Sequence, residues 1–183
     1  MQDHPVDYIL YSDGSTKTNP GIGAYAAIIT DQKTSEETIV TKTFHHTTNN
    51  RMEMLGIIEP IEALYVHDMW RSPNPPSIHV FSDSKYVVNT ATIWVENWKK
   101  NNWKSATGKR SKNIDLLERI LIINNNMVIY YTWVKGHANN NYNNRCDVLA
   151  RDKLVNTEIH HDVEYEAIVA ANPPSTIDVT TLP

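Results

Sequence analysis

The sequence predicts an α/β protein with a five-stranded mixed sheet flanked by helices. Two observations predict this class. Three segments with the apolar pattern of strands come first, and helical and strand patterns alternate after them. Strands that follow one another across short turns form an antiparallel meander, and the alternating part adds further strands with helices packed on the sheet.

Periodicity and turn residues place each element. Turn residues at 19–21 and a polar stretch at 31–36 separate the first three strands, and a proline-rich loop at 73–76 ends the first long helix. Asp83 and Ser84 are suited to cap the helix after the fourth strand. In chain order we expect strands at 6–12, 22–31 and 37–45, a helix at 50–67, a strand at 78–82, helices at 84–91, 93–98 and 114–124, a strand at 127–134 and a helix at 142–155.

The first long helix contains a local conflict. Gly56 and Pro60 fall inside it, and a proline there removes a backbone hydrogen bond and clashes with the preceding turn. Either the helix kinks near Gly56 or it is broken in two. A kink is favoured because one apolar stripe continues across the interruption, formed by Leu55, Ile58, Ile61 and Leu64.

Composition indicates one compact domain at residues 1–155, followed by a partly ordered acidic tail at 156–183. The chain has 183 residues and is 40% hydrophobic, which is enough to bury a sizeable core. It contains no long apolar run and no secretory signal, so no membrane association is expected. Cys146 is the only cysteine, so it forms no internal disulfide. A monomer in the reducing cytoplasm is expected, with Cys146 packing in a helix.

The charge is divided unevenly along the chain. The net charge is −4, but residues 152–183 hold six acids and one lysine, which leaves residues 1–151 with a net charge of +1. Residues 98–112 contain six basic side chains and no acid. The overall charge therefore hides a local basic surface of the kind that binds nucleic acid.

Four acidic residues occur where the predicted elements would bring them to one point. Asp13 and Asp83 each end an apolar strand pattern, Glu53 opens a helical pattern, and Asp147 lies in the last helix. Carboxylates brought together repel one another unless divalent cations neutralise them. This arrangement is typical of a metal site for phosphoryl chemistry.

The segments around these acids resemble the type 1 ribonuclease H family, which cuts RNA in RNA–DNA hybrids. The resemblance spans about residues 6 to 151. A single short motif such as DGS would be weak evidence for the family, whereas five blocks in family order are specific evidence. These blocks are YSDGSTKTNPGIGAYAA at 11–27, TTNNRMEM at 47–54, FSDSKYV at 81–87, NWKKNNWKSATGK at 97–109 and VKGHANNNYNNRCDVLAR at 134–151.

The resemblance implies a ribonuclease H-like fold and two Mg²⁺ ions, which Mn²⁺ can replace. Asp13 and Asp83 would contact both ions, Asp147 the ion nearer the attacking water, and Glu53 the ion nearer the leaving group. His137 would assist proton transfer and product release. The stretch Asn139-Asn140-Asn141 departs from the family's usual glycine- and proline-containing loop. The implied reaction leaves 3′-hydroxyl and 5′-phosphate ends.

The resemblance also implies how an RNA–DNA hybrid duplex would bind. The RNA side would meet Asn19, Asn49 and Asn50, and the 2′-hydroxyl is the group that distinguishes RNA from DNA. Residue Thr18 stands where the family often has glycine. On the DNA side, the expected contacts are Thr48 and Asn113 to a phosphate, Tyr86 and Trp98 to the sugars, and a basic protrusion that contains Lys99, Lys100, Trp103 and Lys104.

Two other functions fit parts of the sequence. A relative on the same fold could cut DNA, as a junction resolvase or transposase-like nuclease does; the TTNN block and the basic protrusion argue against this. A hybrid-binding module without catalysis is the other alternative. The presence of all four acids argues against it, because binding alone gains nothing from unneutralised carboxylates.

Overall fold

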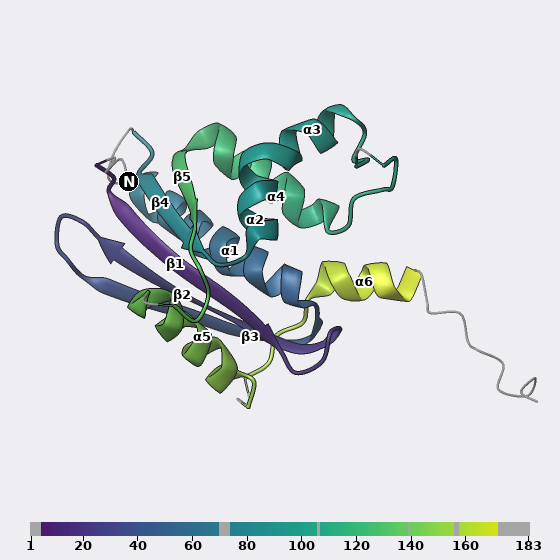
Figure 1. Ribbon diagram of the computed structural model, residues 1–183, viewed down its shortest axis with the longest axis horizontal. Coiled ribbons are helices and arrows are strands. Elements are labelled where there is room, and N and C mark those ends of the chain that lie inside the picture. Colours follow the sequence, from purple (N-terminus) through teal and green to yellow (C-terminus); the bar gives the residue numbers. More distant parts are fainter. Residues whose placement is uncertain (1–4, 70–73, 106, 139, 156–157, 172–183) are drawn as a thin grey trace, which may run out of the picture.

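The computed structural model describes residues 5–69, 74–105, 107–138, 140–155 and 158–171, and its centre is a five-stranded sheet (Figure 1). The strand order is β3-β2-β1-β4-β5, which confirms the expected mixed sheet. The strands are β1 (Tyr8–Thr16), β2 (Gly21–Asp31), β3 (Glu37–Thr47), β4 (Ser77–Ser82) and β5 (Val128–Trp133).

The pairing of the strands follows from the length of chain between them. Short turns join β1, β2 and β3, which pair antiparallel as the meander predicted. The chain passes through α1 before β4 and through further helices before β5, and β4 pairs in parallel with both β1 and β5. In the register of β1 and β4, Ser12 aligns with Ser82. Asp13, within β1, and Asp83, directly after β4, therefore lie at the same level of adjacent strands.

The helices lie on both faces of the sheet. In Figure 1, α1 lies behind the sheet and α5 in front of it. Side chains along β2 point alternately to the two faces of the sheet, and both faces are apolar. Tyr25 and Ile29 pack in the core cluster that contains α1, whereas Ala26 and Ile28 pack with Cys146 of α5. The helices are α1 (Asn49–Met69), α2 (Lys85–Asn89), α3 (Val95–Lys100), α4 (Ile114–Asn126), α5 (Asn141–Lys153) and α6 (Val163–Ala171).

The predicted break between helices at 84–91 and 93–98 is wrong. A π-helical turn at Thr90–Trp94 joins α2 to α3, so the backbone stays helical from Lys85 to Lys100. The predicted cap is confirmed, because the Ser84 hydroxyl accepts a hydrogen bond from Val87 N at 3.3 Å. A wider helical turn does not interrupt the sequence pattern in the way that a loop does, so periodicity could not reveal it.

Helix α1 runs through Pro60 and is not broken in two. Gly56 has a packing reason: a Cβ atom there would collide with the Ser12 hydroxyl of β1 and lie 3.1 Å from Cβ of Tyr25 in β2. The glycine lets α1 approach the sheet closely, and this close contact fixes the height of Glu53 above β1. The predicted kink near Gly56 stays a prediction.

The chain after α5 returns to the domain in its described part. His160 N donates to Thr43 O at 2.7 Å, and His45 N donates to His160 O at 2.9 Å, so residue 160 extends the outer edge of β3. Asp162 is 3% exposed, and α6 starts directly after it. The acidic tail was predicted from 156 to 183; residues 156–157 and 172–183 lie outside the described residues.

Across the described ranges, no helix combines the length and the apolar character that crossing a membrane requires.

Candidate active site

Four different elements carry the four predicted acids. Asp13 lies within β1, where it pairs with Ala26, because β1 continues to Thr16 and does not end at residue 12 as predicted. Asp83 follows the last residue of β4, Glu53 lies in the second turn of α1, and Asp147 lies in the middle of α5.

The other three acids lie close enough to Asp13 to affect its pKa. Burial and the charges of Asp83, Asp147 and Glu53 together raise the pKa of Asp13 to about 7, although a hydrogen bond from Gly14 N lowers it. Burial also raises the pKa of Glu53, with a further contribution from Asp83. A carboxylate that is taken from water and faces other carboxylates is costly to ionise. The site therefore concentrates negative charge that these side chains do not neutralise among themselves.

Two glycines allow the elements to meet at this point. A Cβ atom at Gly14 would lie 2.5 Å from Glu53 N, so only glycine lets β1 touch the backbone of α1 beside the acid. A Cβ atom at Gly136 would collide with the Asp83 carboxylate, so the loop before α5 packs directly on that acid. The first close approach joins β1 to α1 beside Glu53, and the second joins the loop before α5 to Asp83.

Each of the four carboxylates accepts a hydrogen bond from a neighbouring donor. Asn49 Nδ2 and Ser84 Oγ donate to Glu53 at 2.9 and 2.6 Å, which holds both of its oxygens. The other bonds are Gly14 N to Asp13 at 2.7 Å, Asn143 Nδ2 to Asp83 at 3.1 Å, and Arg151 Nη2 to Asp147 at 2.6 Å. These donors orient the carboxylates separately around the site.

The residues fit a divalent cation by their chemistry. Within the ranges that the structure describes, no three acidic, histidine or cysteine side chains are gathered closely enough to hold a metal ion directly. The hydrogen bonds explain why the carboxylates stay apart. Each carboxylate turns away from the others and toward its own N–H or O–H donor. A hard cation prefers oxygen ligands and would supply the charge that offsets the repulsion now raising the pKa of Asp13.

His137 lies beside the acids on the loop that precedes α5. Its Nδ1 atom is 3.6 Å from Asp147 Oδ2, and its side chain is 77% exposed. The backbone is left-handed at this residue, with φ of 51°. An exposed imidazole next to a site carboxylate can exchange protons with solvent.

The residues predicted to meet RNA border the acids. Asn49 N donates to Asn19 Oδ1 at 3.2 Å, so the turn after β1 and the start of α1 are joined. Thr48 is half-buried, its carbonyl accepts from Met52 N at 3.1 Å, and Asn50 is exposed. Because Asn49 also bonds Glu53, hydrogen bonds link two of the predicted RNA contacts to one of the acids.

The residues predicted to meet DNA lie along α2, α3 and the start of α4. Tyr86 is half-buried, and the charge of Glu53 contributes to the raised pKa of its hydroxyl, although burial is the larger cause. Trp94 stands between Tyr86 and Trp98, with ring centroids 6.1 and 5.5 Å away. Asn113 precedes α4 in a left-handed conformation, with φ of 56°.

The basic protrusion, residues 98–112, begins at the end of α3 and continues as a loop in its described residues 101–105 and 107–112, and its lysines are exposed. Trp98 and Trp103 pack against the core. Lys99 lies 4.9 Å from the centre of the Trp103 ring and 3.3 Å from Glu118, whereas Lys100 and Lys104 are exposed. The tryptophans therefore anchor the loop, and the ammonium groups face outward.

A family model described as RNase H matches residues 5–155, which is most of the chain. The chain belongs to the RNase H family. Ribonuclease H of Serratia proteamaculans is 41% identical over 157 residues, covering 86% of this chain and 94% of that protein. Ribonuclease H of Rhodopseudomonas palustris strain HaA2 is 39% identical over 150 residues, covering 82% and 87%. Ribonuclease H is a hydrolase of the nuclease class, and this chain is an enzyme of that class.

Solved structures agree on the fold. LC9-RNase H1, described as a type 1 RNase H with the type 2 active-site motif, has a TM-score of 0.68 and 24% identity, covering 92% of this chain and 83% of that chain. LC11-RNase H1 in complex with an RNA/DNA hybrid has a TM-score of 0.55 and 22% identity, covering 79% and 94%. At these identities the likeness shows the RNase H fold alone.

Sequence reasoning missed two side chains at this RNase H site. Ser84 was recognised only as a helix cap, but its hydroxyl also donates to Glu53. Asn143 is 1% exposed and holds Asp83. Its spacing was a usable signal, because residues four apart on a helix share one face and Asn143 lies four positions before Asp147. Cys146 packs against β1 as expected, and burial raises the pKa of its thiol to about 12, so it is unreactive.

Proposed function

We propose that this enzyme is an endoribonuclease that hydrolyses the RNA strand of RNA–DNA hybrids, using two divalent cations, Mg²⁺ or Mn²⁺. The observation that supports the proposal most strongly is that four elements bring four carboxylates near one another, where burial and the charges of the other three acids raise the pKa of Asp13 to about 7. A binding module would gain nothing from such mutual repulsion, whereas a nuclease uses it to hold cations.

In this proposal Asp13 and Asp83 would hold both ions, Asp147 would hold the ion on the side of the attacking water, and Glu53 would hold the ion on the side of the leaving group. Bound there, divalent cations would supply Lewis acidity for the attacking water and positive charge for the phosphate. The protein's own contribution is orientation. Asn49 and Ser84 fix both oxygens of Glu53, so its direction is set before substrate arrives.

The reaction balances as a hydrolysis. The oxygen of water bonds to phosphorus, the bond between phosphorus and the 3′ oxygen breaks, and that oxygen takes a proton to become the 3′-hydroxyl, which leaves a 5′-phosphate. His137 is placed to move protons between solvent and the neighbourhood of Asp147, from which its Nδ1 is 3.6 Å away. Its exposure suits exchange with bulk water.

The surface around the acids favours a hybrid over duplex DNA. Asn19, Asn49 and Asn50 present amide groups that can bond 2′-hydroxyls, and the Asn49 backbone is already tied to Asn19. Thr48 and Asn113 would hold a DNA phosphate, and Lys100 and Lys104 would follow the backbone. The complex of LC11-RNase H1 with an RNA/DNA hybrid is consistent with this use of the fold.

An assay with a hybrid whose RNA strand is labelled at its 5′ end tests the proposal. We expect internal cuts that require Mg²⁺ or Mn²⁺, and labelled fragments that a poly(A) polymerase can extend, because extension needs a 3′-hydroxyl. Cleavage in excess EDTA, or fragments that carry a 3′-phosphate and resist extension, would contradict the mechanism.

A further inference from the structure

We propose that Asp162 is a positioning residue for hybrid binding. Acting through Arg51, it holds the turn that carries Thr48, Asn49 and Asn50 in a fixed position against the start of α4. This inference rests on the proposed function, because the turn is where we place the RNA and DNA contacts. Asp162 lies beyond the region that the RNase H family model matches, which ends at residue 155.

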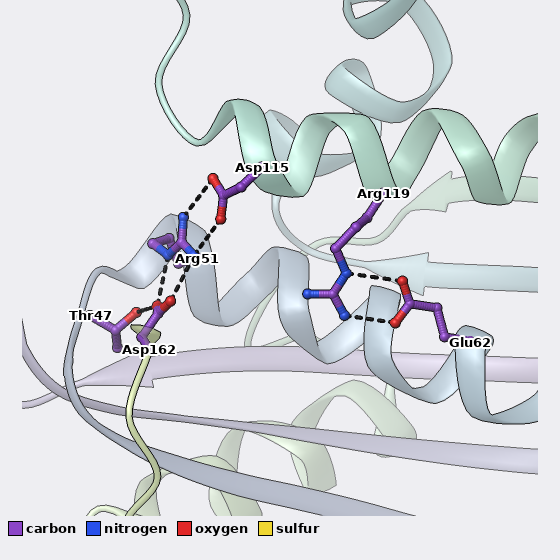
Figure 2. Close-up of polar contacts among 6 residues, drawn as sticks. All are labelled: Thr47, Arg51, Glu62, Asp115, Arg119 and Asp162. Atoms are coloured by element: carbon purple, nitrogen blue, oxygen red, sulfur yellow. Dashed lines mark hydrogen bonds and ion pairs between the residues drawn. The ribbon is translucent and has the colours of Figure 1, made fainter. Parts of the chain in front are cut away.

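Arg51 is the centre of the arrangement, and Figure 2 shows its two carboxylate partners on opposite sides. Its side chain is 1% exposed. Nε and Nη2 donate to Asp162 at 2.7 and 2.7 Å, and Nη1 and Nη2 donate to Asp115 at 3.0 and 2.7 Å. Two bidentate pairs share one guanidinium, which fixes its plane and its direction.

Asp162 also ties the end of β3 to this cluster. The Thr47 hydroxyl donates to Asp162 Oδ2 at 2.7 Å, and Thr47 is fully buried. The carbonyl of Asp162 accepts from Glu166 N at 2.8 Å as α6 starts, and the ring of Tyr165 lies 5.5 Å from the Arg51 guanidinium carbon. The C-terminal segment therefore reaches the junction of β3 and α1 with both its backbone and its side chains.

The cluster connects the parts of the molecule that we expect to contact substrate. The predicted contacts Thr48, Asn49 and Asn50 lie between Thr47 and Arg51, both of which bond Asp162. Asp115 lies two residues after Asn113, the other predicted phosphate contact. Arg51 thus sets the separation between the two sides of a phosphate site, and Asp162 sets the direction of Arg51.

The free energy of a buried ion pair favours a role for Asp162 in positioning over a role in stability. A buried ion pair contributes little net stability, because removing two charges from water offsets their attraction, whereas losing one partner leaves a buried charge uncompensated. Only one arrangement of the Arg51 and Asp162 side chains satisfies all the hydrogen bonds of the cluster, so the cluster fixes their orientation. A displacement of about 1 Å at a substrate contact can cost up to about 100-fold in rate.

The same two helices offer a matched control, also drawn in Figure 2. Arg119 of α4 donates to Glu62 of α1 through two bonds of 2.9 and 2.7 Å. Glu62 lies about 16 Å further along α1 than Arg51, at about 1.5 Å per residue. This second pair joins α1 to α4 far from the substrate turn, so its loss should not change how substrate binds.

The test compares Asp162→Asn with Glu62→Gln. Binding of a fluorescein-labelled hybrid is measured in EDTA, KM and kcat are measured in Mg²⁺, and circular dichroism confirms that each variant is folded at the assay temperature. Asp162→Asn should weaken hybrid binding and raise KM on the order of tenfold while kcat changes less. Glu62→Gln should change neither.

Thr47→Val provides a second variant, because it keeps the shape and both ion pairs and removes only the bond to Asp162. It should raise KM in the same direction by a smaller factor. The double variant Thr48→Ala with Asp162→Asn should lose less than the product of the single losses, because both substitutions act on the same phosphate contact.

Unchanged binding and KM in Asp162→Asn and Thr47→Val would overturn the inference. An equal rise in KM in Glu62→Gln, or independent losses in the double variant, would also overturn it. A wild-type protein that neither binds nor cuts the hybrid would instead overturn the proposed function, and this inference with it.

Discussion

Replacing Asp13 by Asn should stabilise the protein when no metal is bound. Burial and the three neighbouring acids raise the pKa of Asp13 from its ordinary value of 3.8 to about 7. At about 1.4 kcal/mol for each tenfold change in proton affinity, this rise corresponds to at most about 4 kcal/mol. Asp13 is partly open to solvent, which screens the repulsion. We therefore expect a gain of about 2 kcal/mol in the free energy of unfolding at pH 8.

The direction of the pH dependence follows from the raised pKa. Below pH 3.8 Asp13 is protonated in both the folded and the unfolded state and costs nothing. As the pH rises, the unfolded state ionises first, so stability falls until the pH passes about 7, where the folded state ionises as well. Wild-type protein in EDTA should lose stability between pH 4 and pH 7, and Asp13→Asn should lose less over the same range.

Urea unfolding in EDTA at pH 5 and pH 8, repeated at pH 8 with Mg²⁺, measures this effect. Mg²⁺ should stabilise the wild type more than the variant, because the variant lacks one metal ligand and the repulsion that the cation relieves. Asp152→Asn, at an exposed position of α5, is the control and should change stability little. If Asp13→Asn is no more stable than the wild type in EDTA at pH 8, the four acids do not converge as the structure places them.

Three further outcomes test the site and the protrusion. Asp83→Asn should abolish turnover in Mg²⁺ while hybrid binding, measured by fluorescence anisotropy, stays within about threefold of wild type. His137→Ala should slow single-turnover cleavage less than Asp83→Asn does, since solvent can replace an exposed imidazole; equal losses would contradict this order. Replacing Lys99, Lys100 and Lys104 together by Ala should weaken hybrid binding and reduce its log–log salt slope by roughly 0.9 for each phosphate that is no longer neutralised, without removing the preference for hybrid over duplex DNA.

Local pattern predicted the strands and the site acids because both depend on short stretches of sequence. The apolar segments of the first strands, the turn residues between them and the position of Asp83 directly after β4 can be read within a few residues. The π-helical turn at Thr90–Trp94 could not, because a widened turn keeps the apolar pattern of the helix around it. The sequence predicted a mixed sheet but not the order of its strands or the register between them.

Long-range polar contacts were beyond sequence reasoning. Asp162 counted as one acid in an acidic tail, yet it is buried against Arg51, which lies 111 positions earlier in the chain. Arg51 itself stands within the TTNNRMEM segment, where its neighbours attracted attention as substrate contacts. An arginine that follows a strand and opens a helix gives no local signal of the carboxylates that will enclose it.

Cleavage of matched duplexes tests the central claim most directly. RNA–DNA hybrid, double-stranded RNA and double-stranded DNA of one sequence are incubated with the protein, with Mg²⁺ present or withheld, and the products of each labelled strand are resolved on a denaturing gel. We predict cuts in the RNA strand of the hybrid alone, and only with Mg²⁺. Cleavage of the DNA strand or of double-stranded DNA, or an intact hybrid in the presence of Mg²⁺, would contradict the account.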